Sequence, residues 1–557
     1  MAEFSSRSQR VRELCRRLAP FIGKKAEEIN FAYLAEDKTG KEQIEVYLEA
    51  LVSQYLREKS LDGESNLVPP NASLAAGEYA IGDIIYGGRK MGNFGLREKE
   101  WIQHLGIFGR TGAGKTNMGF QVLRQLRAHG KPFLVFDWKR NYRDLTTLPE
   151  FKDVKVYTPG RDISPLSFNP LIPPPGTPPK TWLKKIIEVV AHAYLLGNGV
   201  LFLLQQSVDA VYEKFGLYEG LISRFPTFRD VLDEAQRRDS KGREAGWLAS
   251  TLRALSSLCF GDMDSVVNQG GSLGVGDLLE QSAILELDAL TQSDKVFFIQ
   301  SMLLWIHHYR MMEGQRETFK HALVIEEAHH VLSGERRSLV GGQTVMDITF
   351  REIREFGESI IILDQHPSQI SLPALGNTYT TICLNLKHSR DVSAMGQCML
   401  LEGEEKDLLG TLEVGQAVVK LQGRIPRPFM IEIPEFPLRK GTVLDEEVAA
   451  RMGGKVQPAK ASSALRGARQ PNRGGQTPGP PSLDVYMLHD IEEYPESGIA
   501  GRYKRLSISV RQGEKLRARL AKEGLITDTK EQTQTGSIRR IRLTEKGRTN
   551  QFLSSDK

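Results

Sequence analysis

The residues best suited to chemistry in this chain are Gly109 to Thr116, which read GRTGAGKT. This is the G-x-x-x-x-G-K-T spacing of a phosphate-binding loop. Its glycines let backbone N–H groups point at phosphates, Lys115 adds a positive charge, and the Thr116 hydroxyl is a magnesium ligand. The flanking sequence predicts a strand before the loop and a helix over 117–129, which is an anion-binding arrangement. We expect these nucleotide contacts: Gly109, Thr111, Gly112, Ala113, Gly114, Lys115, Thr116 and Asn117.

Hydrolysis of ATP also needs an acid near Mg²⁺ and a base for the attacking water. The stretch HALVIEEAH, residues 321–329, is an apolar strand that ends in two carboxylates. In α/β folds, ligands bind at the carboxyl ends of the strands. We expect Glu326 to lie on the magnesium side and Glu327 to polarise the water. The alternative is a strand that ends in solvated acids.

A third group of candidates lies in FREIREFGESIIILDQHPSQI, which starts at Phe350. Gln365 follows an apolar strand, where a sensor residue would contact a γ-phosphate or position water. Arg351 and Arg354 are expected on one helix near this edge, and an arginine presented to a neighbouring subunit would act as a finger. The alternatives are a solvated loop amide for Gln365 and a solvated helix face for the arginines.

The elements that position these residues form an α/β domain with a mainly parallel sheet, because strand and helix patterns alternate over about 100–440. A mostly helical region occupies about 180–260. The apolar run from Val189 to Leu204 is interrupted by His192 and by Gly197-Asn198-Gly199, which indicates two buried helices and no membrane span. The expected strands are Leu105–Phe108, Phe133–Phe136, Ala283–Leu287, Ala322–Ile325, Ser359–Leu363 and Thr381–Leu384.

The flanking regions divide the chain into domains. Residues 1–76 read as a helical N-terminal region and linker, and the ATPase domain is expected over 77–440, beginning with a hairpin that contains Gly87-Gly88. Residues 441–482 are rich in Gly, Pro and Ser and predict a disordered basic linker. Residues 483–557 predict three helices and two strands, at Leu483–Glu493, Gly498–Leu506, Ser509–Glu523, Leu525–Thr527 and Ile538–Leu543.

Composition indicates the number of domains and the cellular compartment, but not the function. A chain of 557 residues predicts three to four domains, and a net charge of +5 is too small at this length to indicate a binding partner. The four cysteines, Cys15, Cys259, Cys383 and Cys398, lack C-x-x-C spacing and indicate neither a disulfide scaffold nor a zinc site. The N-terminal segment has no apolar signal core. A cytoplasmic protein is expected.

These elements resemble the HerA/FtsK group of P-loop ATPases, and the HerA-like proteins most. The resemblance covers about residues 77–435 and rests on His104 five residues before Gly109, then GRTGAGKT, FDWKRNY, VIEEAH, REIREFG and LDQHPS. It implies a RecA-like fold and a homo-hexameric ring that grips double-stranded DNA in its channel and moves it with ATP. It also implies that Glu326 and Glu327 are the paired acids, Gln365 the sensor, and Arg354 the better candidate than Arg351 for the finger in trans.

Several features depart from that family. Glu326 stands where many relatives have Asp, Arg140 and Asn141 replace Gly and Glu in a D-x-H/K-G-E-Y pattern, and His366 replaces a common Arg. The first ~60 residues look helical, whereas typical HerA proteins carry an N-terminal β-barrel that docks a nuclease. An alternative to a motor is therefore an ATPase ring that scaffolds an effector, a nuclease or NAD-consuming enzyme, in an anti-phage complex. A third alternative is a conjugative coupling protein, although those usually have membrane helices.

The C-terminal region resembles a winged helix-turn-helix, whose third helix can enter a DNA major groove. Basic side chains of this kind contact phosphates without reading sequence. The alternative is a protein-docking module. The basic residues of the third helix are Arg511, Lys515, Arg517, Arg519 and Lys522, and the second strand adds Arg539, Arg540 and Arg542.

Overall fold

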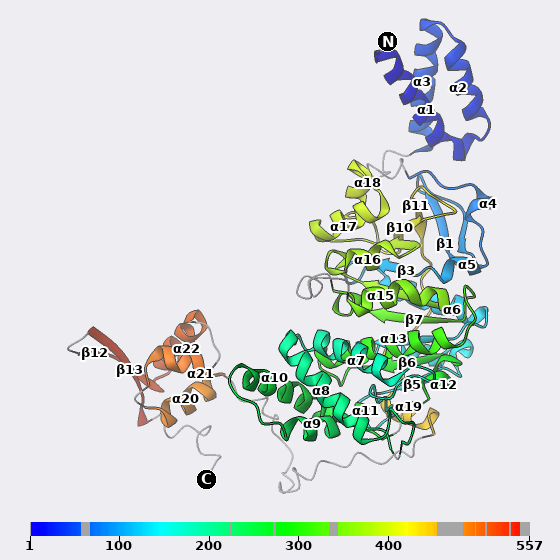
Figure 1. Cartoon of the computed structure of the whole chain (residues 1–557). Helices are drawn as coiled ribbons and strands as arrows, with labels where there is room; N and C mark the ends of the chain where they lie inside the picture. The colour runs from blue at the N-terminus through cyan, green and yellow to red at the C-terminus, as the bar shows by residue number, and fades with distance from the viewer. Residues whose placement is uncertain are drawn as a thin grey trace. The chain divides into compact units, whose positions relative to one another are not determined.

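One large sheet carries the candidate site (Figure 1). The computed structural model describes residues 2–56, 67–222, 224–270, 274–333, 344–453, 483–495, 497–506, 510–533 and 536–545. Within these ranges eleven strands form one sheet in the order β2-β1-β11-β10-β9-β3-β8-β7-β4-β6-β5. They are β1 Tyr79–Tyr86, β2 Arg89–Leu96, β3 Leu105–Phe108, β4 Phe133–Asp137, β5 Lys155–Tyr157, β6 Ala283–Glu286, β7 His321–Glu326, β8 Glu358–Asp364, β9 Thr380–Cys383, β10 Gln416–Leu421 and β11 Phe429–Glu432.

The sheet is parallel from β9 through β3, β8, β7, β4 and β6 to β5, and antiparallel from β10 to β2. The mainly parallel α/β sheet is therefore confirmed, and each expected strand agrees within a residue at either end. Strands β5 and β11 were not among those expected. The β1–β2 hairpin forms as predicted, and its turn residues Gly87 and Gly88 both have positive φ, at 55° and 67°, which favours glycine there.

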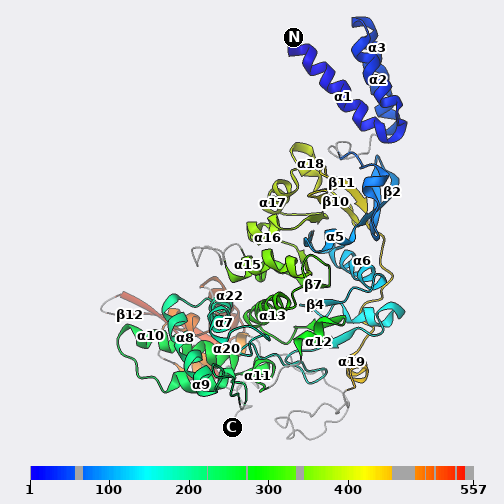
Figure 2. The same cartoon turned by 45° about the vertical axis from the view of Figure 1, so that its right-hand side comes forward.

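Apolar residues on both faces of the sheet hold the domain together. In β4, Leu134 and Phe136 belong to one buried cluster, and Phe133 and Val135 belong to the other. The first cluster includes side chains of α13 (Gln292–Met312) and α15 (Val345–Glu352), and the second includes α6 (Lys115–Ala128). Because successive strand residues alternate between faces, an almost continuous apolar strand is buried on both sides. Figure 2 shows α13 and α15 beside β7.

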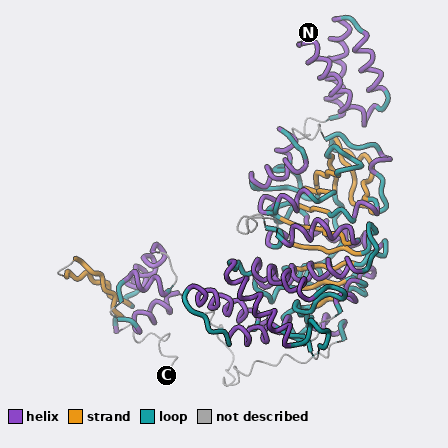
Figure 3. The backbone as a smooth tube through the Cα atoms, in the orientation of Figure 1, coloured by secondary structure: helices purple, strands orange, loops and turns teal. Residues whose placement is uncertain are grey.

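The helical region joins the first cluster. Its helices are α7 Pro179–Ala193, α8 Asn198–Lys214, α9 Phe228–Gln236, α10 Arg243–Leu258, α11 Gly261–Val267 and α12 Val275–Leu279. The predicted helical region is confirmed, and Figure 3 shows its helices in purple. The apolar run Val189 to Leu204 spans the end of α7 and the start of α8. None of the helices in the described ranges is both long and apolar enough to span a bilayer.

The N-terminal region is helical, as predicted. It contains α1 Ala2–Ile22, α2 Lys25–Ala35 and α3 Lys38–Tyr55, around a small core that includes Leu18 and Leu48. Phe21 stacks between Tyr55 and Tyr86, with ring centroids 5.3 and 5.4 Å away. Tyr86 belongs to β1, so this stack ties the helices to the hairpin. The first compact unit of the chain, Met1–Pro458, also contains α4 Ala72–Ala75, α5 Glu98–Trp101, α16 Leu372–Gly376, α17 Ser389–Met399, α18 Gly403–Leu408 and α19 Asp445–Arg451.

Residues 433–451, which we call the C-terminal strap, cross α6 after the last strand. The side chain of Asn117 donates to Pro434 O at 3.0 Å and accepts from the Phe436 N–H at 2.7 Å. Further on, Asp144 accepts three backbone N–H groups of residues 441–443. The strap ends in α19, and Val448 is buried. The predicted linker over 441–482 therefore begins too early, and its part from 454 onward lies outside the described residues.

Asp445, the first residue of α19, anchors the strap electrostatically. Its carboxylate lies 2.5 Å from both Arg140 and Arg161 and 2.7 Å from Arg143. Arg143 is buried and also pairs with Glu286 at the end of β6. Because the Asp445 side chain is 34% exposed, water screens these ion pairs, and together they contribute about 1 kcal/mol or slightly more.

The second compact unit, Ala459–Lys557, contains α20 Leu483–Glu493, α21 Ile499–Arg505, α22 Val510–Lys522, β12 Ile526–Thr533 and β13 Gly536–Leu543. Three helices and two strands are present as expected, but β12 extends six residues beyond the predicted end at Thr527 and β13 begins two residues before the predicted Ile538. A winged helix-turn-helix stays a prediction. On α22, Lys515 and Arg519 are exposed. Arg517 instead faces β12, where it pairs with Asp528 at 3.1 Å. Arg511, Arg539 and Arg540 have side chains outside the described set.

Candidate active site

Four neighbouring strands bring the predicted residues to one edge of the sheet. Strand β3 pairs with β8, β8 with β7, and β7 with β4, all in parallel. The phosphate-binding loop follows β3, Gln365 follows β8, Glu326 ends β7, and Asp137 ends β4. Residues more than 200 positions apart therefore meet because parallel strands end on the same side.

A cavity of about 370 Å³ opens at this edge. Nine of the residues predicted for the site line it, and Gly109, Ala113 and Arg354 do not. Lys139, Asn141, Leu363 and Lys440 also contribute. The predicted residues in its wall are Thr111, Gly112, Gly114, Lys115, Thr116, Asn117, Glu326, Glu327 and Gln365.

The phosphate-binding loop has the backbone that its glycines allow. Gly112 and Gly114 have φ of 80° and 108°, in the region that side chains avoid. Helix α6 then starts at Lys115, so its first N–H groups face the cavity. The Lys115 ammonium donates to Gly109 O at 2.7 Å and to Arg110 O at 3.1 Å. Burial lowers the pKa of Lys115, and the carboxylates of the site oppose that shift.

Glu327 is held at the mouth of the cavity by two donors. Its Oε1 accepts from Lys139 Nζ and from Gln365 Nε2, both at 2.7 Å. Its backbone lies in the left-handed region at φ 48° and ψ 45°, which costs a non-glycine residue on the order of 1–2 kcal/mol. Gln365 also accepts a hydrogen bond from the Thr111 hydroxyl. The predicted base and the predicted sensor therefore share a hydrogen bond and connect to the phosphate-binding loop.

Glu326 lies deeper and faces a second carboxylate. Its Oε1 accepts from the Tyr142 hydroxyl at 3.1 Å. Burial raises the pKa of Glu326, opposed by hydrogen bonds from Tyr142 and Asn141. Burial and the charge of Glu326 raise the pKa of Asp137 to about 8. Glu326 and Thr116 line the same cavity, and their side-chain oxygens are the hard ligands that Mg²⁺ prefers.

The residues present therefore fit a magnesium ion. Within the described ranges no group of three or more His, Cys, Asp or Glu side chains could hold a metal by itself. A P-loop site needs no such group, because Mg²⁺ binds one or two protein oxygens and completes its shell with phosphates and water. Thr116 and Glu326 would supply those two oxygens.

Asp364 joins the loops that follow β7 and β8. Its carboxylate accepts from the backbone N–H groups of His329 at 2.7 Å and of His366 at 2.6 Å. The His329 Nδ1–H donates to the same carboxylate, and this contact outweighs burial and raises the pKa of His329. Because Glu327 and Gln365 lie on these two loops, Asp364 fixes their separation.

His104 connects the phosphate-loop strand to the segment that carries the arginines. This buried ring donates from Nε2 to Phe350 O at 2.7 Å and accepts at Nδ1 from the Ile360 N–H at 3.0 Å. Burial lowers its pKa to about 4, so the ring is neutral at physiological pH. Phe350 belongs to α15 and Ile360 to β8, so one imidazole holds three elements in register.

The two finger candidates do not share one helix, contrary to the prediction. Arg351 lies in α15, whereas Arg354 lies in the following 3₁₀ turn, Ile353–Phe356, which Gly357 ends at φ 88°. The tightening from α to 3₁₀ changes the angle between the two side chains. Arg351 is exposed and Arg354 is half-buried. Neither arginine is among the residues that line the cavity.

Lys139 and Lys440 line the cavity but are not among the predicted site residues. Lys139 lies in FDWKRNY, a motif that could have indicated a role for it. Lys440 had no signal, because it lies on the strap more than 300 residues after the loop that it faces. Its ammonium also lies 5.8 Å from the centroid of the Phe120 ring on α6.

Comparison with known proteins finds similarity to the HerA family, as the sequence motifs predict. Residues 80–181 match the profile of the family described as Helicase HerA, central domain. The chain is 24% identical over 377 residues to the DNA double-strand break repair helicase HerA of Sulfolobus acidocaldarius, covering 65% of this chain and 70% of the relative. For HerA of Saccharolobus solfataricus the identity is 23% over 378 residues, covering 65% and 69%.

Among solved structures, VirB4 of Thermoanaerobacter pseudethanolicus is similar with a TM-score of 0.50 at 15% identity, covering 65% of this chain and 98% of that one. This similarity concerns the fold. Together with the sequence matches, it confirms the predicted resemblance to the HerA/FtsK group and the P-loop ATPase fold.

Proposed function

We propose that this HerA/FtsK-type P-loop ATPase is a motor that hydrolyses ATP to move double-stranded DNA. The observation that carries the proposal is the common cavity: Lys115, Thr116, Glu326, Glu327 and Gln365 all line it. The similarity to proteins named as DNA repair helicases supplies the substrate class.

The residues divide the work as follows. Backbone N–H groups of the loop and the Lys115 ammonium bind the phosphates. Thr116 and Glu326 would hold Mg²⁺, and a bound Mg²⁺ would supply positive charge opposite the phosphate oxygens. Glu327 takes a proton from the attacking water. Gln365 hydrogen-bonds Glu327, so it would transmit the state of the γ-phosphate to the base.

The site would be completed by a neighbouring subunit. An arginine finger stabilises the charge of the transferring phosphoryl group and accelerates hydrolysis by about 10³–10⁵-fold. The proposed finger is Arg354, with Arg351 as the other candidate. Both lie outside the cavity of their own subunit, as a residue acting in trans must. A homo-hexameric ring, as in the resembling family, would present the arginine in this way.

A second candidate function is a ring that organises an effector enzyme, such as a nuclease or NAD-consuming enzyme, in an anti-phage complex. The observation favouring it is the helical N-terminal region, whose α2 and α3 expose four large apolar side chains: Phe31, Leu34, Val46 and Tyr47. Exposed apolar residues on a small helical module suit protein docking.

ATPase assays with and without duplex DNA distinguish the two functions. A motor is stimulated by duplex DNA and displaces a protein roadblock from it in the presence of ATP. A scaffold hydrolyses ATP at a rate that DNA does not change and that a co-purifying protein does. Absence of ATP hydrolysis under both conditions would contradict both functions.

A further inference from the structure

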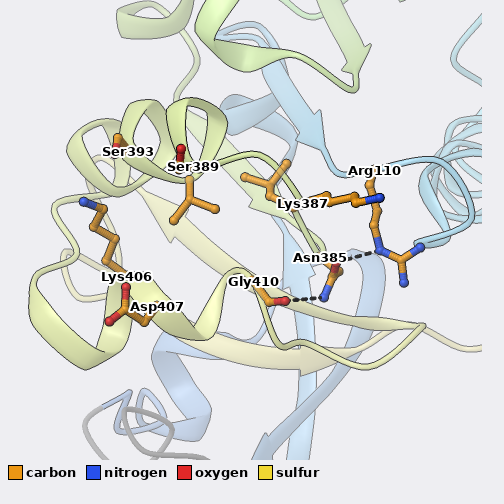
Figure 4. Close-up of a pocket in the computed structure, with 10 residues that line it drawn as sticks. Arg110, Asn385, Lys387, Ser389, Ser393, Lys406, Asp407 and Gly410 are labelled. Carbon is orange, nitrogen blue, oxygen red and sulfur yellow. Dashed lines mark hydrogen bonds between the residues drawn. The ribbon is translucent and has the colours of Figure 1, made fainter.

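A second cavity, of about 680 Å³, lies next to the nucleotide site on the side of β9. Figure 4 shows its wall, which comes from the phosphate-binding loop, the segment after β9, α17 and α18. Three cationic side chains and one carboxylate contribute: Arg110, Lys387, Lys406 and Asp407. The other polar side chains are Asn385, Ser389 and Ser393.

The positive groups come from three separate elements. Arg110 belongs to the phosphate-binding loop, Lys387 follows β9, and Lys406 belongs to α18. The stem of Lys406 lies against α17 at Gly396, where a Cβ would come within 2.9 Å of the Lys406 Cγ. A larger residue at position 396 would displace the lysine, so the close packing fixes the path of the Lys406 stem beside the cavity.

The cavity is joined to the nucleotide site through Arg110. The Arg110 backbone N–H donates to Asn385 O and its Nε to Asn385 Oδ1, both at 2.7 Å. The Asn385 amide donates in turn to Gly410 O at 3.1 Å and to Leu412 O at 2.8 Å. Figure 4 shows the chain from Arg110 through Asn385 to Gly410. The next residue along the loop, Thr111, lines the nucleotide cavity.

We propose that this second cavity binds the phosphate backbone of DNA. The proposal rests on the proposed motor function and locates one of its contact surfaces. Guanidinium, ammonium and hydroxyl groups are the usual partners of backbone phosphates. The apolar residues of the wall are Leu386, which is buried, and half-exposed Val392. An acidic peptide would bind with apolar or aromatic anchors as well, and this wall offers no pocket for one.

Binding of a DNA strand in the second cavity would bring its phosphates close to the nucleotide site. A phosphate bound at Arg110 contacts the phosphate-binding loop itself, and Lys387 lies two residues after Asn385, which hydrogen-bonds Arg110. DNA would therefore be sensed one residue away from the nucleotide cavity. The arrangement provides a direct route from DNA contact to ATP turnover, without a change in the rest of the sheet.

Salt dependence of binding tests the proposal. The experiment measures the affinity of the full chain for a 30-bp duplex by fluorescence anisotropy across a salt series, with a non-hydrolysable ATP analogue. The parent chain is compared with Lys387→Ala/Lys406→Ala. The matched control is Lys184→Ala/Lys241→Ala, which removes two exposed lysines outside the cavity. Thermal unfolding and native mass are recorded for every chain.

Two lost phosphate contacts lower the slope of log K against log salt by about 1.8, which corresponds to about 60-fold weaker binding at 0.1 M salt. The control pair should bind like the parent. Parent-like slope and affinity in Lys387→Ala/Lys406→Ala overturn the proposal. A loss of binding that accompanies a fall in assembly mass also overturns it, in favour of a subunit contact. A parent chain that binds no duplex refutes the motor function itself.

Discussion

Replacing Glu327 by Gln is the sharpest test of the chemistry. Lys139 and Gln365 both donate to the same atom, Glu327 Oε1. A glutamine can direct its own carbonyl oxygen to that position and keep both hydrogen bonds. Its NH₂ group then replaces Oε2, which lies 4.0 Å from His329 Nδ1. The substitution therefore removes the base with little change in the surrounding contacts.

The expected losses are very different in size for stability and for turnover. The substitution removes the ion pair with Lys139, whose side chain is 59% exposed, and makes the hydrogen bond from Gln365 neutral, so the cost to stability is about 1 kcal/mol. Loss of a general base lowers turnover by about 10²–10⁴-fold, equivalent to about 2.7–5.4 kcal/mol in the barrier. ATP affinity should be kept, since the loop, Lys115 and Thr116 are unchanged.

The assay pairs steady-state hydrolysis with retention of labelled ATP on the protein, and thermal unfolding verifies the fold. Glu327→Gln should retain unhydrolysed ATP while turnover collapses. Glu326→Gln is the informative comparison, because it should raise the Mg²⁺ concentration needed for activity. Turnover of Glu327→Gln within about fivefold of the parent would refute the assignment of the base, given the expected 10²-fold minimum.

Three further outcomes follow from the same structure. Lys115→Ala should lower hydrolysis at least 10²-fold, measured by phosphate release, because it removes the cation facing the phosphates; hydrolysis at half the parent rate would contradict this. Asp445→Ala should expose residues 441–453 to limited proteolysis and cost about 1 kcal/mol or slightly more, since the carboxylate is one-third exposed, whereas Glu446→Ala on the same helix should not. Burial depresses the pKa of His104 to about 4, below the usual 6.5. The contribution of the neutral ring to folding stability is therefore complete above pH 6.5 and falls as the pH drops toward 4, with a loss of about 2 kcal/mol at pH 5. Thermal unfolding of His104→Asn should show a shallower acid dependence than that of the parent.

The carboxyl edge of the sheet was predictable because its signal is local. Each of β3, β7 and β8 is an apolar run followed at once by polar residues, such as Glu326 or Gln365. The pattern alone indicates where the strand ends and which side chains lie there. Burial of both sheet faces makes the run continuous, so the strand limits could be read within a residue.

What the sequence did not reveal depends on contacts over long separations. Lys440 enters the nucleotide cavity because Asn117 and Asp144 bind the strap, and no local pattern encodes such pairings. Strand β5 has three residues, Lys155–Tyr157, too few to show a period. Helix α15 changes to a 3₁₀ turn at Ile353, and Gly357 ends that turn in the left-handed conformation. The i, i+3 spacing of Arg351 and Arg354 is compatible with an α-helix, so it did not reveal this change.

The C-terminal strap gives the chain a defined line of tension. A force applied at residue 453 acts first on α19, where Asp445 forms ion pairs with three guanidinium groups. If those ion pairs open, the load passes to the Asp144 carboxylate and then to Asn117, immediately after the threonine proposed to bind magnesium. Force transmitted along the strap from residue 453 would therefore reach the nucleotide site at Asn117 only after the contacts of Asp445 and Asp144 have opened.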